Sequence, residues 1–164
     1  MLFRSRVTDF VALLRLLTDT GVEFIIVRGA AATAHGPHVD LDIVYNRSRV
    51  NVERVVSALR HINPYLRGTP PGLPFDWSVE TVQTGLHFTL TTTLGALHLL
   101  GEIVGGGGYD QLAPHTIDIE VAGVRCQCLA LERLIDVKRA AGRPKDLEVV
   151  AELEHILSET QGGC

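Results

Sequence analysis

Two aspartates, Asp40 and Asp42, interrupt a stretch that otherwise reads as a β-strand, VDLDIVY (39–45). Side chains two positions apart on a strand lie on the same face, about 6.6 Å from each other. At an effective dielectric constant near 20, two carboxylates at that distance repel each other by about 2.5 kcal/mol. That cost is large beside a typical stability of about 5–15 kcal/mol, so the pair needs either solvent or a positive partner.

A run of small residues, RGAAATAHG (28–36), lies just upstream and follows the β-rich segment VEFIIV (22–27). The run predicts a turn at Gly29 and a short helix from Ala30 to Ala34, which gives the order strand, turn, short helix, strand. A glycine turn lets the backbone approach a phosphate, and the N-terminus of the next helix offers free N–H groups.

Carboxylate oxygens suit Mg²⁺, which usually binds together with substrate phosphates. The pattern therefore predicts that a metal ion and a phosphate meet between the strand of Asp40 and Asp42 and the turn at Gly29. The alternative is that both aspartates face solvent and the alanines only pack closely.

The composition favours one ordinary folded domain over residues 1–164. A formal net charge of −4 gives no overall attraction to nucleic acid, so any phosphate-binding surface must be local. Every apolar run is far shorter than the roughly 20 residues that span a bilayer, and three cysteines give no disulfide framework for a domain of this size. We therefore expect a cytoplasmic protein with no membrane association.

Periodicity along the rest of the chain predicts alternating helices and strands. A helix is expected over about 7–20, a sheet over about 22–128, and two helices over about 130–158 that separate at Gly142-Arg143-Pro144. Ser48 is the predicted cap of a helix in between. The fold class is therefore α/β (α+β), with a mixed sheet flanked by helices and a C-terminal helical pair.

Shorter signals complete this outline. Two hairpins are predicted, over 86–100 and over 115–131 with a turn near Ala122-Gly123. The Pro- and Gly-rich span 63–74 predicts an irregular connection, and the four glycines at 105–108 predict a flexible loop.

The pattern as a whole resembles the nucleotidyltransferase superfamily with the DNA polymerase β-like fold, and most closely its small bacterial members, the minimal nucleotidyltransferases and the AbiEii-type toxins. The turn at 28–36 resembles the family pattern GG-x-AA-x-x-HG, and Asp40-x-Asp42 follows it. The segment GALHLLGEIVG (95–105) resembles G-x-x-D-L-L-G-E-x-x-G, and the segment from Leu131 to Leu153 resembles the family's Leu-Ile-x-x-Lys…Gly-Arg-x-Lys-Asp element. The similarity runs from about residue 22 to about residue 157.

The resemblance implies a nucleotidyltransferase fold and transfer of a nucleoside monophosphate from an NTP to a hydroxyl on RNA, protein or a small molecule. It implies that Asp40 and Asp42 bind Mg²⁺, and that Gly29 and Ala30 hold the nucleotide at the turn.

It also implies that Lys138 and Lys145 reach the triphosphate, with Asp146 orienting one of them. The alternative for these basic residues is a solvated helix end, where they complement the helix dipole.

Two residues depart from the family pattern. Arg28 stands at the first glycine of the turn, where it can either contact a phosphate or obstruct the nucleotide. His98 stands where the third metal-binding carboxylate is expected. Imidazole is a poor ligand for Mg²⁺ but suits Mn²⁺ better, and its pKa near neutrality permits general-base work.

These departures leave two hypotheses. The chain is either a Mg²⁺- or Mn²⁺-dependent transferase weakened at His98, or a catalytically impaired nucleotide-binding or regulatory protein. The second includes one component of a toxin–antitoxin pair with a cognate partner protein.

Overall fold

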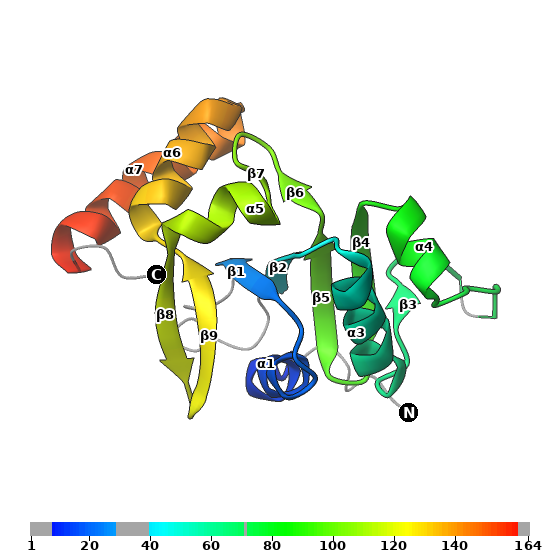
Figure 1. Cartoon of the computed structure of the whole chain (residues 1–164). Helices are drawn as coiled ribbons and strands as arrows, with labels where there is room; N and C mark the ends of the chain where they lie inside the picture. The colour runs from blue at the N-terminus through cyan, green and yellow to red at the C-terminus, as the bar shows by residue number, and fades with distance from the viewer. Residues whose placement is uncertain (1–7, 29–39, 71, 161–164) are drawn as a thin grey trace.

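The computed structural model of the chain describes residues 8–28, 40–70 and 72–160 (Figure 1). This part is a mixed α/β structure of the α+β type, built on a seven-stranded sheet with the strand order β3-β4-β5-β2-β1-β9-β8. The sheet is mixed, because β2 runs parallel to β5 and β1 runs parallel to β9, whereas the other neighbours are antiparallel. Its strands are β1 (Phe24–Arg28), β2 (Leu41–Tyr45), β3 (Tyr65–Leu66), β4 (His87–Thr92), β5 (Gly95–Leu100), β8 (Thr116–Val121) and β9 (Val124–Leu129).

A small second sheet pairs β6 (Glu102–Ile103) with β7 (Gly107–Gly108). Within the described residues the α-helices are α1 (Phe10–Asp19), α3 (Arg49–Arg60), α4 (Val79–Thr84), α5 (Tyr109–Leu112), α6 (Leu131–Ala141) and α7 (Pro144–Thr160). The short helix predicted at 30–34, together with Gly29 and Ala30, lies outside the described residues.

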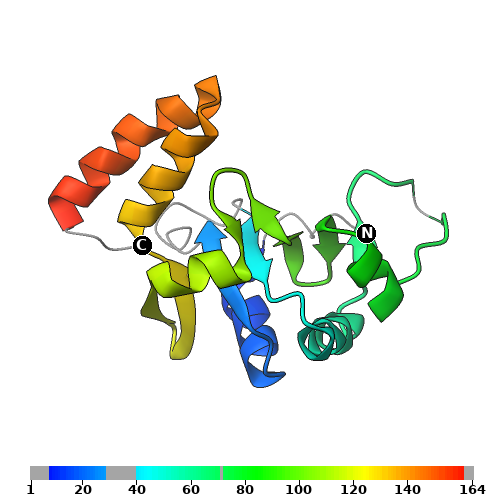
Figure 2. The same cartoon turned by 45° about the horizontal axis from the view of Figure 1, so that its top comes forward.

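The main core lies between one face of the sheet and the helices α1 and α3 (Figure 2). Alternate residues of each strand point into it, as period-2 patterning requires. The buried set includes Leu13 and Leu17 of α1, Val52, Val55 and Leu59 of α3, Leu41, Ile43 and Tyr45 of β2, and Leu97 and Leu99 of β5.

A second, smaller cluster lies on the opposite face and joins β1, β2 and β9 to α5 through Ile25, Val27, Val44, Leu112 and Leu129. That face therefore has an apolar part under α5. The residues that β2, β5 and β4 present farther along the same face are polar, and they form the candidate site described below.

The predicted helix cap at Ser48, the break between the two C-terminal helices and the turn near Ala122-Gly123 are confirmed. Ser48 caps α3 by accepting a hydrogen bond from the Asn51 N–H. Gly142 ends α6 in the left-handed conformation at φ +66°, and α7 begins at Pro144. The hairpin of β8 and β9 turns at Ala122 and Gly123, both with positive φ.

Two predictions for irregular segments hold only in part. The span 63–74 contains β3, which pairs with β4 and forms one edge of the sheet. Residues 105–108 form part of the β6–β7 hairpin rather than a flexible loop, because Gly105 (φ +83°) packs against the backbone of α6. In the ranges that the structure describes, no helix has the length and apolar character needed to cross a membrane.

Candidate functional site

A β-bulge at the end of β1 brings Arg28 to the face that carries the aspartates. The strands β1 and β2 pair in regular register as far as Ile26 and Ile43, but the next pair is Arg28 and Asp42, which leaves Val27 as an extra residue. An extra residue in one strand shifts the alternation of the side chains that follow it. Val27 still packs in the cluster under α5, and Arg28 now lies opposite Asp42.

The register of the sheet extends this pair into a row. Asp42 pairs with His98 on β5, and His98 pairs with Thr89 on β4. The Arg67 N–H, just after β3, donates to the Thr89 carbonyl at 3.0 Å. Residues in register on neighbouring strands share a face. Arg28, Asp42, His98, Thr89 and Arg67 therefore form a polar row that crosses the sheet.

His98 lies between the two aspartates. Its Nδ1 is 2.9 Å from Asp42 Oδ1, and its Nε2 is 3.2 Å from Asp40 Oδ2. Asp42 is buried, at 8% exposure, and the side chains of His98 and Asp40 are partly exposed. The structure thus brings together three of the residues singled out from the sequence, Asp40, Asp42 and His98.

These contacts are close but are not aligned as hydrogen bonds. Asp42 Oδ1 and His98 Nε2 are buried atoms without a hydrogen-bond partner among the described residues. The cluster of Asp40, Asp42 and His98 is therefore held mainly by charge attraction.

Arg67 supplies a second positive partner. Its Nη1 donates to Asp40 Oδ2 at 3.0 Å. Burial by itself raises the pKa of Asp40, but the hydrogen bond and charge of Arg67, with smaller effects of His98 and Arg28, outweigh it and hold that pKa below its ordinary value. Arg67, His98 and Arg28 therefore all favour the ionised form of Asp40.

The pKa of His98 is raised. The main cause is the short side-chain contact with Asp42, which favours the protonated imidazole and to which the charge of Asp42 adds. Burial opposes the shift, the charge of Asp40 adds to it, and the charge of Arg67 opposes it. The imidazolium form of His98 is thus stabilised between the two carboxylates.

A divalent ion fits this arrangement only in part. Two carboxylates are suitable ligands for Mg²⁺ or Mn²⁺. Within the described residues, however, no three His, Cys, Asp or Glu side chains are arranged to hold a metal ion. Because each nitrogen of His98 faces one carboxylate, the ring stands where an ion shared by Asp40 and Asp42 would lie. As arranged, these residues do not form a metal centre.

The predicted basic element forms the junction of α6 and α7. Asp146 is 2% exposed, and it accepts hydrogen bonds from Arg143 Nε, from Arg143 Nη2 at 3.1 Å and from Lys138 Nζ at 3.5 Å. The hydrogen bond from Arg143 is the main cause that lowers the pKa of Asp146. Asp146 therefore contacts Lys138 and holds Arg143 more closely, while Lys145 is exposed.

No interaction within the described residues joins Lys138, Lys145 or Asp146 to the acid cluster. In Figure 1 the pair α6–α7 stands at one end of the sheet, above β8 and β9. The β6–β7 hairpin touches this pair, since a Cβ on Gly105 would lie 2.6 Å from the Val137 carbonyl. The hairpin thus connects the strand of His98 to the basic element.

Sequence reasoning missed Arg67. It lies in the Pro- and Gly-rich span that was read as an irregular connection, and its partner Asp40 is 27 positions away. A cation next to a segment of alternating strand pattern is a weak signal, and only the pairing of β3 with β4 places it beside the acids.

The chain matches no protein-family model and no curated protein. The residues and contacts above are accordingly the basis of the function proposed below.

Proposed function

We propose that the chain is a nucleotidyltransferase-like, nucleotide-binding protein in which His98 and Arg67 impair transfer. One observation carries this proposal: Asp42 and His98 lie in register on the parallel strands β2 and β5, with Asp40 beside them. This is the arrangement that the resemblance implies for the paired acids and the third ligand position. The fold assignment to the nucleotidyltransferase type is part of the same proposal.

The contacts of the acids support impairment. A two-metal transfer needs the carboxylates free to bind ions that activate the attacking oxygen and stabilise the leaving one. Here the imidazole of His98 approaches both carboxylates, and Arg67 binds Asp40. The protein's own cations thus offset the repulsion that a metal would otherwise have to remove.

The nucleotide would be held mainly by groups outside the acid pair. The resemblance assigns its phosphates to the turn of Gly29 and Ala30 and to Lys138 and Lys145, and Arg28 lies on the same face as Asp42. An exposed guanidinium has donors for phosphate oxygens, so the proposal takes Arg28 as a phosphate contact rather than an obstruction.

A second candidate is a weakened but active transferase that uses Mg²⁺ or Mn²⁺. It is favoured by Asp42 Oδ1 and His98 Nε2, which form no aligned hydrogen bond within the described ranges of the chain. If His98 turns away, Asp40 and Asp42 are free to share an ion. The acceptor would be a hydroxyl on RNA, on a protein such as a cognate partner, or on a small molecule.

Binding is tested by calorimetry with each NTP in the presence of Mg²⁺ or Mn²⁺. We expect the natural protein to bind, and Arg28→Gln to bind at least about tenfold more weakly, because it removes a guanidinium that contacts the phosphates. Arg49→Gln, at an exposed arginine of α3, is the matched control and should bind normally. Absence of binding by the natural protein with every NTP and both metals would contradict the proposal.

Transfer is tested with NTPs labelled at the α-phosphate and with RNA and protein acceptors. Under the proposal, label transfer by His98→Asp exceeds that of the natural protein at least about tenfold, since a carboxylate replaces the imidazole between the acids. Equal transfer by both proteins, above the Asp42→Ala background, would instead establish the active transferase.

A further inference from the structure

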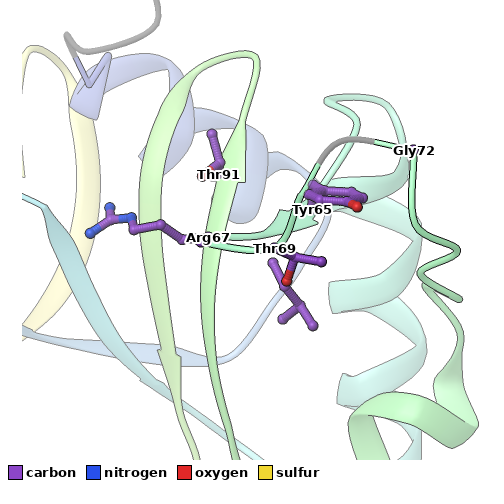
Figure 3. Close-up of a pocket in the computed structure, with 7 residues that line it drawn as sticks. Tyr65, Arg67, Thr69, Gly72 and Thr91 are labelled. Atoms are coloured by element: carbon purple, nitrogen blue, oxygen red, sulfur yellow. The ribbon is translucent and has the colours of Figure 1, made fainter.

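A cavity of about 370 Å³ lies at the edge of the sheet that β3 forms (Figure 3). It is formed at the junction of β3 with β4 and the segment that follows β3. Arg67 belongs both to the wall of this cavity and to the ion pair with Asp40. The lining residues are Tyr65, Leu66, Arg67, Gly68, Thr69, Gly72 and Thr91.

The cavity is built into the fold. The Tyr65 hydroxyl lies 2.8 Å from the Pro70 carbonyl and 3.0 Å from the Leu73 carbonyl, so it holds the segment after β3 in place. The ring of Tyr65 packs edge-on against Phe75, with centroids 6.0 Å apart. At Gly68 and Gly72 an added Cβ would meet nothing within 4 Å, which shows open space on that side.

The lining has a definite chemical character. Tyr65, Leu66 and the two glycines present carbon surface, and Thr69 and Thr91 add hydroxyls with no hydrogen-bond partner among residues 8–28, 40–70 and 72–160. Arg67 lines the cavity, and in Figure 3 its side chain leads away from Tyr65 and Thr69.

Arg67 has binding capacity to spare. A guanidinium carries five N–H donors, and the side chain is 41% exposed. Among the described residues, Nη1 is the Arg67 nitrogen engaged in a side-chain contact, with Asp40 Oδ2. The remaining donors can accept a second anion, and guanidinium binds carboxylate and phosphate groups through paired, charge-assisted hydrogen bonds.

We propose that this cavity binds a small organic anion, with an apolar or aromatic body against Tyr65 and Leu66 and a carboxylate or phosphate head on Arg67. The head and Asp40 then compete for one guanidinium. Occupation of the cavity therefore weakens the hold of Arg67 on Asp40. This site needs neither a metal ion nor an NTP, so it goes beyond the function proposed above.

Four probes test the proposal in the presence of EDTA: 1-naphthyl phosphate, 1-naphthoate, the neutral 1-naphthol and inorganic phosphate. Binding is followed by proton–nitrogen NMR titration of the amides of Gly68, Gly72 and Thr91. We expect at least one of the two naphthyl anions to bind at least about tenfold more tightly than 1-naphthol and than phosphate alone. Comparison of the two anions identifies the preferred head group.

Variants assign the contacts. Arg67→Gln should weaken binding of the naphthyl anion about tenfold, whereas Arg49→Gln, at an exposed arginine of α3, should leave it unchanged. Thr91→Phe should fill the cavity and abolish binding, while the isosteric Thr91→Val should retain it. Asp40→Asn should strengthen binding, because it removes the anion that competes for Arg67.

Three results would overturn the proposal. They are equal binding of 1-naphthol and the anions, unchanged binding by Arg67→Gln, and amide shifts confined to residues outside the cavity. Thermal melts establish that each variant is folded. No measurement here contains a nucleotide or a metal, so failure of this proposal and failure of the proposed function are distinguishable.

Discussion

Asp40 and Asp42 share one face of a sheet, where two bare carboxylates would repel each other by about 2.5 kcal/mol. In the folded chain His98 approaches both acids and Arg67 binds one of them. At the scale of single residues, the position where the resemblance implies a third acid thus holds a group that can be positive, and this change converts repulsion into attraction.

Because His98 stands in place of a third acid, the free energy of unfolding should depend on pH. The pKa of His98 is raised above 6.5 by folding, mainly through Asp42. A group of this kind stabilises the folded state fully below its unfolded pKa, near 6.5, and the contribution is lost as the pH rises through the folded value. We expect the free energy of unfolding of the natural protein to exceed that of His98→Gln most at about pH 5.5.

Urea unfolding in EDTA, measured at several pH values from about 5.5 to 9, checks this expectation. The difference between the two proteins should shrink as the pH rises. His115→Gln, at an exposed histidine outside the site, should show no such trend. A difference that grows with pH would contradict the assignment.

At the scale of elements, one buried side chain fastens α3 to the sheet. Asn51, 1% exposed, accepts from the Glu23 N–H at 2.6 Å and donates to the Glu23 carbonyl at 3.0 Å and the Asn46 carbonyl at 2.7 Å. These bonds join the helix to the start of β1 and to the end of β2, whose other end holds the aspartates.

We therefore expect Asn51→Ala to lower the free energy of unfolding by about 2–4 kcal/mol, because it leaves several buried backbone groups without partners. Ser57→Ala, at an exposed position of the same helix, should change it by less than about 0.5 kcal/mol. Denaturant unfolding monitored by circular dichroism measures both. Equal effects of the two substitutions would show that the Asn51 bonds contribute nothing specific.

The β6–β7 hairpin offers a second test at this scale. Gly105 and Gly123 have nearly the same backbone conformation, with φ of +83° and +84°, but a Cβ on Gly105 would meet the Val137 carbonyl at 2.6 Å whereas one on Gly123 meets nothing within 4 Å. Alanine at Gly123 should cost about 1–2 kcal/mol from conformation alone. Alanine at Gly105 should cost clearly more, because it also separates the hairpin from α6.

The comparison of Gly105→Ala with Gly123→Ala in urea unfolding isolates the contact from the conformational cost. If both variants lose the same stability, the hairpin is not packed on α6 in solution. In that case the connection between the strand of His98 and the basic element would be lost.

Elements with strong local signals could be predicted from the sequence, and short ones could not. Ser48 and Gly142 mark helix ends by their own chemistry, so α3 and α6 were expected. By contrast, β3, α4 and α5 have 2, 6 and 4 residues, too few to show a period. They exist because of what they pack against, and the cation supplied next to β3 was missed for the same reason.

At the scale of the whole molecule, α1 and α3 cover one face of the sheet, whereas α5 covers only part of the other (Figures 1 and 2). The helix α7 packs chiefly against α6 and exposes Leu147, Val149 and Ile156. Its attachment to the rest of the fold is therefore weaker than that of the central strands.

We expect α7 to open without unfolding of the sheet. Native-state hydrogen exchange should show lower opening free energies for amides of α7 than for amides of β2 and β5, because local stability follows buried apolar contact. Mass spectrometry of peptides after exchange measures this difference. Equal protection of α7 and the central strands would mean that the helix folds cooperatively with the sheet.

The convergence of Asp40, Asp42 and the residue at position 98 could be anticipated, because a strand alternates strictly and the resemblance supplied the pairing. The attachments of the acids to His98 and Arg67 could not be anticipated, since they depend on strand order across the sheet. Sequence thus indicated where the acids would meet, and only the folded chain reveals which cations meet them.

The β-bulge at Val27 meets the different packing requirements of two adjacent residues, the apolar Val27 and the charged Arg28. With uninterrupted pairing, Val27 would stand opposite Asp42, and Arg28 would be driven among the aliphatic side chains beside Leu41. Because β1 contains one extra residue there, the apolar Val27 and the basic Arg28 can both lie on the same face of the sheet. Without the bulge, the Arg28 guanidinium would be buried among aliphatic side chains. Asp42 would at the same time lose the cation opposite it.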